Sequence, residues 1–261
     1  MGLPEETRHA TEARRLRGVL TGALAFQILL GLLLFAGDLG RDFTMPGGGS
    51  DAPEFRMPTS PGDQTRRYDP KEMPATRPAG PGIRTDGPLP DRLVLEERDG
   101  AFRLSGSIER GDGERIARQI SARMTAEAPP KQVFLNSPGG SVTDALELGR
   151  AIRAAGLGTA MEDGDICLSA CPYIFAAGVT RRAEDGARIG VHQHYFGENT
   201  LLPAFIAVSD IQRGQGLVVE YLVEMGIDLR LMQPALITPP EEIYLLSREE
   251  LEEFNLVTSG S

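Results

Sequence analysis

The sequence contains no tryptophan, two cysteines, three histidines and only two lysines among its 261 residues. Two cysteines are too few for a disulfide scaffold, and they lack the second pair that a structural zinc site requires. The formal net charge of −10 argues against a nucleic-acid-binding surface, which needs clustered lysine and arginine side chains. No P-loop motif is present, so any ATP dependence would come from a partner. We therefore expect no metal, no cofactor and no nucleic-acid partner.

One uncharged run, residues 18–37, is long enough to cross a hydrocarbon core of roughly 30 Å as a helix. Several arginines precede this run and Asp38 follows it, so the positive-inside rule predicts a single-pass anchor with residues 1–17 in the cytoplasm. A cleaved signal peptide is the alternative, but Phe35-Ala36-Gly37 is a poor cleavage site. The rest of the chain is then expected outside the cytoplasm.

Proline and glycine dominate residues 38–90. Ten of the chain's 19 prolines lie between Pro46 and Pro90, together with the run Gly47-Gly48-Gly49-Ser50 and without apolar periodicity. Such a segment cannot bury a core, so we expect an extended, disordered linker. Residues 91–261 then remain to form one packed domain.

Short apolar strands and amphipathic helices alternate in residues 91–261. The predicted segments are a hairpin of residues 92–96 and 101–105 around Asp99-Gly100, helices at 116–124, 141–155, 172–177 and 203–225, strands at 132–135, 166–168 and 189–191, and a last helix that begins near Ser247 with a capping box to Glu250. Strands that alternate with helices indicate βαβ units with parallel pairing. The pattern predicts a layered α/β core with C-terminal helices.

Ser169 lies between a short apolar strand and a helix-like run, so its hydroxyl would project from a strand-to-helix turn. The NH of Ala170 would lie at the positive end of that helix, and Gly139-Gly140 can bring another NH close because neither residue has a Cβ. Two such donors would form an oxyanion hole. Serine needs a base, and His192 ends an apolar segment as a residue fixed at a strand end would. His194 is a weaker candidate for the base or for substrate binding and is expected to be a surface or loop residue.

These residues carry a family resemblance. The motifs Asn136-Ser137-Pro138-Gly139-Gly140, Ser169-Ala170-Cys171 and a strand that ends in His192-Gln193 follow one another as in the proteolytic subunit of the Clp protease, which the chain resembles over residues 104–251. The resemblance implies a fold of the Clp protease and crotonase type. It also implies that Ser169 is the nucleophile, that His192 is the general base, and that Gly140 and Ala170 supply the oxyanion hole.

The resemblance departs at the third residue of the triad, where the family has an aspartate and this chain has Ile243. A carboxylate would orient the imidazole and stabilise the imidazolium, so the adjacent Glu242, with Glu241 next, is the predicted substitute. Asp210 is a weaker candidate. If no carboxylate points inward, the site is either a Ser-His dyad or a degenerate site in a scaffold or interaction domain.

Two other chemistries are alternatives to the serine and histidine pair. Lys71 lies in the linker and Lys131 opens a strand before the glycine pair, so neither is well placed to deprotonate Ser169. Ser-His chemistry is therefore favoured over Ser-Lys chemistry. A crotonase-like enzyme that acts on a thioester would share the layered core and the oxyanion hole, and it is the third alternative.

The predicted function is a membrane-anchored serine endopeptidase that acts on a peptide or protein substrate. The Cys167-x-Ser169-x-Cys171 signature and the N-terminal apolar segment resemble a bacterial branch of periplasmic Clp-protease-like proteins, which implies an inner-membrane anchor and a periplasmic domain. The family forms rings through a segment after the catalytic histidine, so residues 201–225 are the expected homo-oligomer interface. Cys167 and Cys171 are either inert buried thiols or a disulfide that clamps the nucleophile turn.

Overall fold

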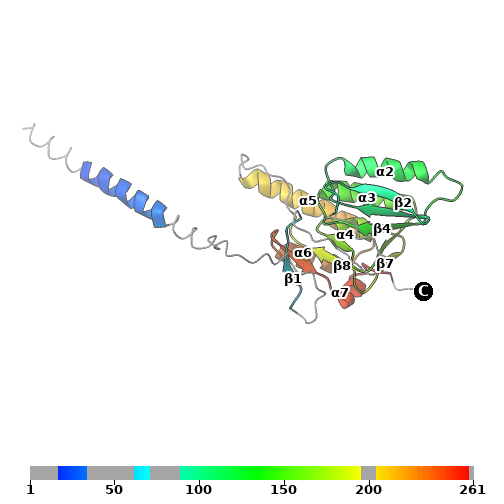
Figure 1. The fold of residues 1–261 in the computed structure, drawn as a ribbon. Helices are drawn as coiled ribbons and strands as arrows, with labels where there is room; N and C mark the ends of the chain where they lie inside the picture. The colour runs from blue at the N-terminus through cyan, green and yellow to red at the C-terminus, as the bar shows by residue number, and fades with distance from the viewer. Residues whose placement is uncertain (1–16, 34–61, 71–88, 195–203, 259–261) are drawn as a thin grey trace, which may run out of the picture. The chain divides into compact units, whose positions relative to one another are not determined.

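The computed structural model describes residues 17–33, 62–70, 89–194 and 204–258 (Figure 1). The chain divides into two units, Met1–Ser50 and Asp51–Ser261, and each is described by itself. Most of the predicted cytoplasmic segment, the end of the predicted anchor and most of the predicted linker lie outside the described residues.

In the first unit, residues 17–33 form one helix, and its large apolar side chains, such as Leu24 and Phe26, are exposed. None of the helices in the described ranges combines the length and the apolar character needed to cross a bilayer. The described helix covers part of the predicted anchor, whose residues 34–37 lie outside the described residues. The anchor therefore stays a prediction.

In the second unit, one mixed sheet has the strand order β2-β3-β4-β5-β7. Strands β2 (Val94–Arg98) and β3 (Ala101–Ser105) form the predicted hairpin, with Asp99 and Gly100 at positive φ in the turn. Parallel pairing then continues from β3 through β4 (Gln132–Asn136), β5 (Gly158–Met161) and β7 (Arg181–Ala183). The predicted α/β architecture with parallel strands is confirmed.

Three helices pack near this sheet (Figure 1). Helix α2 (Asp112–Arg123) packs on α3 (Val142–Ala154), and α3 packs on the short α4 (Cys171–Ala176). The apolar period of α2 buries Ile116 and Ile120, whereas every residue of α4 is buried. Because α4 lies inside the core, the residues just before it are held firmly.

A second mixed sheet has the order β1-β9-β8-β6 and carries the chemistry described below. Strands β6 (Ile166–Leu168) and β8 (Arg188–Val191) are parallel, while β9 (Glu242–Leu245) is antiparallel to β8. Buried apolar side chains of this sheet form a small cluster of Ile166, Leu168, Ile243 and Leu245.

The prediction that residues 38–90 form one disordered linker is wrong for residues 62–70. Strand β1 (Thr65–Arg67) pairs antiparallel with β9, and Tyr68 packs against the small apolar cluster. The physical reason is that the edge of β9 supplies the hydrogen-bond partners, so the segment needs no apolar periodicity of its own to form a strand.

The C-terminal part is helical, as predicted. Helix α5 (Ala204–Glu224) is followed by a 3-10 turn (Leu229–Leu231), α6 (Met232–Ile237) and, after β9, α7 (Arg248–Glu253). Helix α5 buries Val218, Tyr221 and Leu222 against the core. The predicted capping box of Ser247 and Glu250 is confirmed at the start of α7.

Candidate active site

Ser169 occupies a tight turn between β6 and α4. Its φ is +60°, a left-handed conformation that costs a residue with a Cβ about 1 kcal/mol or more. The turn is held from both sides, because the Ser169 NH donates to the Gly190 carbonyl at 2.9 Å and the flanking Cys167 and Cys171 form a disulfide. Of the two alternatives for this cysteine pair, the disulfide is the one present. Strain retained at a turn of this kind is typical of functional sites.

His192 follows β8, the strand parallel to β6, and therefore reaches Ser169 from the neighbouring strand end. Its Nε2 lies 2.7 Å from the Ser169 Oγ, and its Nδ1 lies 3.1 Å from the carbonyl oxygen of Pro240. Because a carbonyl only accepts, Nδ1 carries the hydrogen and Nε2 is left to accept the serine proton. Both side chains are nearly buried, with exposed fractions of 9% for Ser169 and 6% for His192.

The structure does not support Glu242, or Glu241 next to it, as the residue that orients His192. Within the described ranges, no hydrogen bond or ion pair joins either carboxylate to the imidazole, and the Pro240 carbonyl occupies the position facing Nδ1. The cause is the strand register, since Glu242 pairs with Arg67 at the outer edge and the next residue, Ile243, points into the apolar cluster. Asp210 lies exposed on α5. Ser169 and His192 therefore form a hydrogen-bonded pair in which the partner of Nδ1 is a backbone carbonyl.

The protonation of the two histidines follows from their surroundings. Burial lowers the pKa of His192 below its usual range, and the Pro240 and Pro239 carbonyls oppose this shift. Burial and the neighbouring His192 lower the pKa of His194 to about 4. His194 lies half-buried in the loop that follows β8, in agreement with the expected loop position, and its Nε2 is hydrogen-bonded to the hydroxyl of Tyr173. The imidazole that contacts Ser169 is that of His192. At neutral pH, His192 is an uncharged base.

Gly140 and Ala170 are the expected oxyanion donors, and Ala170 directly follows Ser169. In the described part of the chain, neither backbone NH donates to a protein acceptor. The two segments approach closely at Gly139, where an added Cβ would lie 2.6 Å from the Ser169 Cβ and 3.0 Å from the Ala170 nitrogen. The two NH groups beside the nucleophile can therefore stabilise a developing oxyanion.

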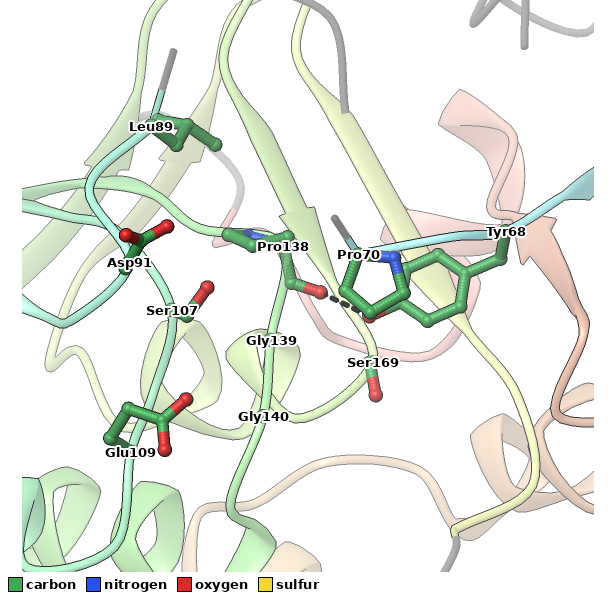
Figure 2. A pocket seen from close by; sticks show the side chains of 10 residues that line it. All are labelled: Tyr68, Pro70, Leu89, Asp91, Ser107, Glu109, Pro138, Gly139, Gly140 and Ser169. Carbon is green, nitrogen blue, oxygen red and sulfur yellow. Dashed lines mark hydrogen bonds between the residues drawn. The ribbon is translucent and has the colours of Figure 1, made fainter. Parts of the chain in front are cut away.

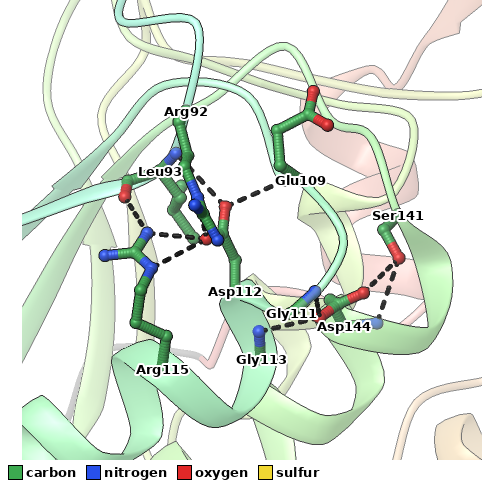
Figure 3. Close-up of polar contacts among 9 residues, drawn as sticks. All are labelled: Arg92, Leu93, Glu109, Gly111, Asp112, Gly113, Arg115, Ser141 and Asp144. Carbon is green, nitrogen blue, oxygen red and sulfur yellow. Dashed lines mark hydrogen bonds and ion pairs between the residues drawn. The ribbon is translucent and has the colours of Figure 1, made fainter.

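The segment that contains Gly139 and Gly140, called the glycine segment below, is held in place by Ile108 and by buried carboxylates. Figure 3 shows the contacts of these carboxylates. Ile108 brackets it, since its NH donates to Gly139 at 2.8 Å and its carbonyl accepts from Ser141 at 2.7 Å. Asp144 joins the start of α3 to that of α2, because its carboxylate accepts from the NH groups of Gly111 and Gly113 and from the Ser141 hydroxyl.

Asp112 continues this network with a fully buried side chain. Burial raises its pKa, but hydrogen bonds from Arg115, Arg92 and the Glu109 NH outweigh that effect and lower the pKa below its usual range. The carboxylate therefore stays ionised and fixes the loop that runs past the glycine pair (Figure 3).

The nucleophile opens onto a cleft of about 600 Å³ (Figure 2). Tyr68 and Pro70 lie on one side of this cleft, Ser107 and Glu109 lie on the other, and the glycine pair lies between them. The full lining consists of Tyr68, Pro70, Leu89, Asp91, Ser107, Glu109, Pro138, Gly139, Gly140 and Ser169.

Tyr68 is a site residue that the sequence analysis missed. Its ring lies edge-on to the His192 ring with the centroids 4.8 Å apart, and its hydroxyl donates to the Pro138 carbonyl at 2.6 Å. Burial raises its pKa to about 12, while the nearby Ser169 hydroxyl acts in the opposite direction. No sequence signal marked Tyr68, because its proline-rich surroundings resemble the rest of the linker.

The predicted exclusion of Ser-Lys chemistry agrees with the position of Lys131. Lys131 comes just before β4, and the glycine pair comes after the end of β4. The five residues of this strand therefore separate Lys131 from the glycine pair by roughly 16 Å. Lys71 lies outside the described residues. Within the described ranges, no group of three or more histidine, cysteine or acidic side chains is arranged to hold a metal ion.

Removal of the disulfide should loosen the nucleophile turn. We expect the double variant Cys167→Ala, Cys171→Ala to lose about 2 kcal/mol in unfolding free energy, because the bridge closes a short loop in the unfolded chain. Chemical denaturation of the oxidised wild type and of the variant measures this difference. The reduced wild type is the matched control and should unfold like the variant. Equal unfolding curves for all three samples would contradict the expectation.

Comparisons with known proteins leave the site to be judged on its geometry. No family model matches the chain, and no curated protein is found to be similar to it.

Proposed function

We propose that this protein is a serine endopeptidase with a Clp-protease-like and crotonase-like core, which cleaves peptide bonds through Ser169 and His192. The observation that carries the proposal is the 2.7 Å contact between the serine Oγ and the imidazole Nε2. It is supported by the left-handed serine turn, by the two backbone NH groups beside it and by an adjoining cleft. A nucleophile, its base and an oxyanion hole are the parts that acyl transfer requires.

The reaction follows from these positions. His192 Nε2 takes the Ser169 proton while Oγ attacks the carbonyl carbon of the scissile peptide bond. The carbonyl oxygen becomes negative and accepts hydrogen bonds from the Gly140 and Ala170 NH groups. Nε2 then passes its proton to the leaving amine, and a water activated in the same way hydrolyses the acyl-enzyme.

The Pro240 carbonyl performs part of the role of a triad carboxylate. It holds Nδ1–H and so keeps the tautomer in which Nε2 can accept a proton. Its partial charge stabilises the imidazolium less than a full carboxylate would. We therefore expect a peptidase that is active but slow. We favour this function over that of a degenerate scaffold.

An active-site fluorophosphonate tests the proposal. It should label the wild-type chain and should fail to label Ser169→Ala, because the nucleophile oxygen is gone. Ser121→Ala is the matched control, since Ser121 lies exposed on α2. Labelling is read by intact-protein mass spectrometry. A wild-type chain that never labels would favour the non-catalytic scaffold, while thioester turnover that survives Ser169→Ala would favour the crotonase-like alternative.

We further propose that residues 18–37 anchor the protein in a bacterial inner membrane, with the domain in the periplasm. The disulfide beside Ser169 supports this location, because such bonds persist in oxidising compartments. Protease treatment of intact spheroplasts measures the topology, and protection of the domain would contradict it.

A homo-oligomer through the region 201–225 is part of the same proposal. Val208, Leu217 and Val223 on α5 have exposed fractions of 50% or more, which supports an apolar contact with another copy. Light scattering of the purified domain, residues 62–261, measures its mass, and a monomer at micromolar concentration would contradict the interface.

A further inference from the structure

Residues 62–70 are bound along the edge of β9. The Tyr68 NH donates to the Glu241 carbonyl at 2.9 Å, and the Leu245 NH donates to the Gln64 carbonyl at 2.8 Å. The Gln64 side chain also donates to the Glu250 carboxylate at 3.1 Å. Among the described strands, β9 has β8 on its other side, so β1 occupies the edge that remained open. An exposed strand edge of this kind is where an extended peptide can add to a sheet.

Tyr68 lies beside the serine and histidine pair and narrows the cleft in front of it. Its ring lies against His192, while its hydroxyl bonds the Pro138 carbonyl, which immediately precedes the oxyanion glycines (Figure 2). The side chain thus bridges the base side and the oxyanion side of the cleft. A substrate carbonyl carbon must come within about 3–3.5 Å of the serine oxygen to react, so it needs this part of the cleft.

We propose that residues 62–70 are an autoinhibitory strand, which occupies a peptide-binding site formed by the β9 edge and the cleft and so keeps other peptides out. The inference rests on the proposed function, since it concerns access to the same serine. Because the segment belongs to the same chain, it competes with added peptides at a high effective concentration. In general, a short flexible linker gives an effective concentration of about the millimolar range. A competing peptide therefore binds after the strand has left β9.

The strand register supplies a matched pair of variants. The Tyr68 NH and the Gln64 carbonyl both bond to β9. Because the backbone groups of alternate residues in a strand point the same way, the NH of residue 66 also points toward β9, whereas the NH of residue 65 points away. Arg66→Pro removes a hydrogen bond to β9 and undocks the strand, because proline has no NH. Thr65→Pro introduces the same residue one position earlier without this loss.

The first measurement is the rate at which a fluorophosphonate linked to an extended peptide labels Ser169. We expect Arg66→Pro to label at least about tenfold faster than Thr65→Pro, which should label like the wild type. Tyr68→Gly, which removes the ring and keeps the NH, should also label faster. Equal rates in all four chains, with Ser169 labelled, would overturn the autoinhibitory strand and leave the peptidase proposal standing.

The second measurement does not depend on catalysis. A fluorescent synthetic peptide with the sequence of residues 62–70 is titrated into Ser169→Ala chains and followed by fluorescence anisotropy. We expect it to bind the chain that also carries Arg66→Pro at least about tenfold more tightly than the chain that carries Thr65→Pro. If this difference is found while none of the four chains of the first measurement, which all keep Ser169, is labelled by the fluorophosphonate, the peptidase proposal is overturned and the occluded peptide site is supported. Equal binding to both chains would overturn the occlusion.

Discussion

The His192→Gln variant is expected to hydrolyse peptides at least about 10³-fold more slowly than the wild-type chain, because Ser169 loses the group that accepts its proton. Glutamine fills a similar volume and can still contact the serine, so the fold should be kept. The measurement is kcat/KM for a fluorogenic peptide across a pH series. The loss should appear in kcat, since His192 acts on the reacting proton and not on the binding of the peptide backbone.

The same pH series tests the environment of His192. Burial lowers the pKa of this imidazole, so the neutral, reactive form persists below the usual histidine pKa of about 6.5. Wild-type activity should be complete above the lowered pKa and should fall as the pH drops through it. The His194→Gln control should keep this acid limb, whereas His192→Gln should lose it. A wild-type midpoint above 6.5 would instead indicate a carboxylate beside the imidazole.

The nucleophile and its base could be predicted from the sequence because both follow short apolar strands. Parallel strands of one sheet end at the same edge, so Ser169 after β6 and His192 after β8 had to lie near one another. The oxyanion donors could also be predicted, since glycine permits the close approach and Ala170 precedes a helix. The order of the motifs thus predicted that Ser169 and His192 lie near one another, which the structure confirms, while the four catalytic roles are part of the proposed function.

The partner of the His192 Nδ1 could not be predicted in the same way. It is the carbonyl of Pro240, and a main-chain oxygen carries no residue signature. Glu242 is the nearest acidic residue to the position where a carboxylate was expected, so the sequence favours it. Only the register of β9, which turns Ile243 inward and leaves Glu242 beside Arg67, decides against it.

Four strands escaped prediction, namely β1, β5, β7 and β9. In β1 and β7 the stabilising partners are distant in sequence. The segment around Tyr68 pairs with β9, more than 170 residues later, and its prolines indicated disorder. Strand β7 begins with Arg181, which is buried although it is charged, and its guanidinium donates to the carbonyls of Gly178, Asn255 and Leu256. A buried arginine is stable once backbone acceptors surround it, and no local pattern announces those acceptors.

The second large effect is expected at Gly140, where both space and backbone conformation require glycine. Its φ is +138°, and an added Cβ would lie 2.2 Å from the Ile108 carbonyl oxygen. Gly140→Ala must therefore push the glycine segment away from Ile108 and move the Gly140 NH out of the oxyanion hole. We expect at least about a 10²-fold slower labelling of Ser169, the typical cost of losing one oxyanion donor. The unfolding free energy should fall by at least about 2 kcal/mol.

Gly156 provides the control that separates the steric clash from the conformational cost of a positive φ. It also has a positive φ, +68°, but no atom lies within 4 Å of an added Cβ. Gly156→Ala should therefore pay the conformational cost alone, about 1 kcal/mol, and should label at the wild-type rate. Denaturant unfolding and fluorophosphonate labelling are measured on both variants. Since the two variants differ in steric clash and in distance from Ser169, equal labelling rates would mean that the Gly140 NH does not stabilise the oxyanion.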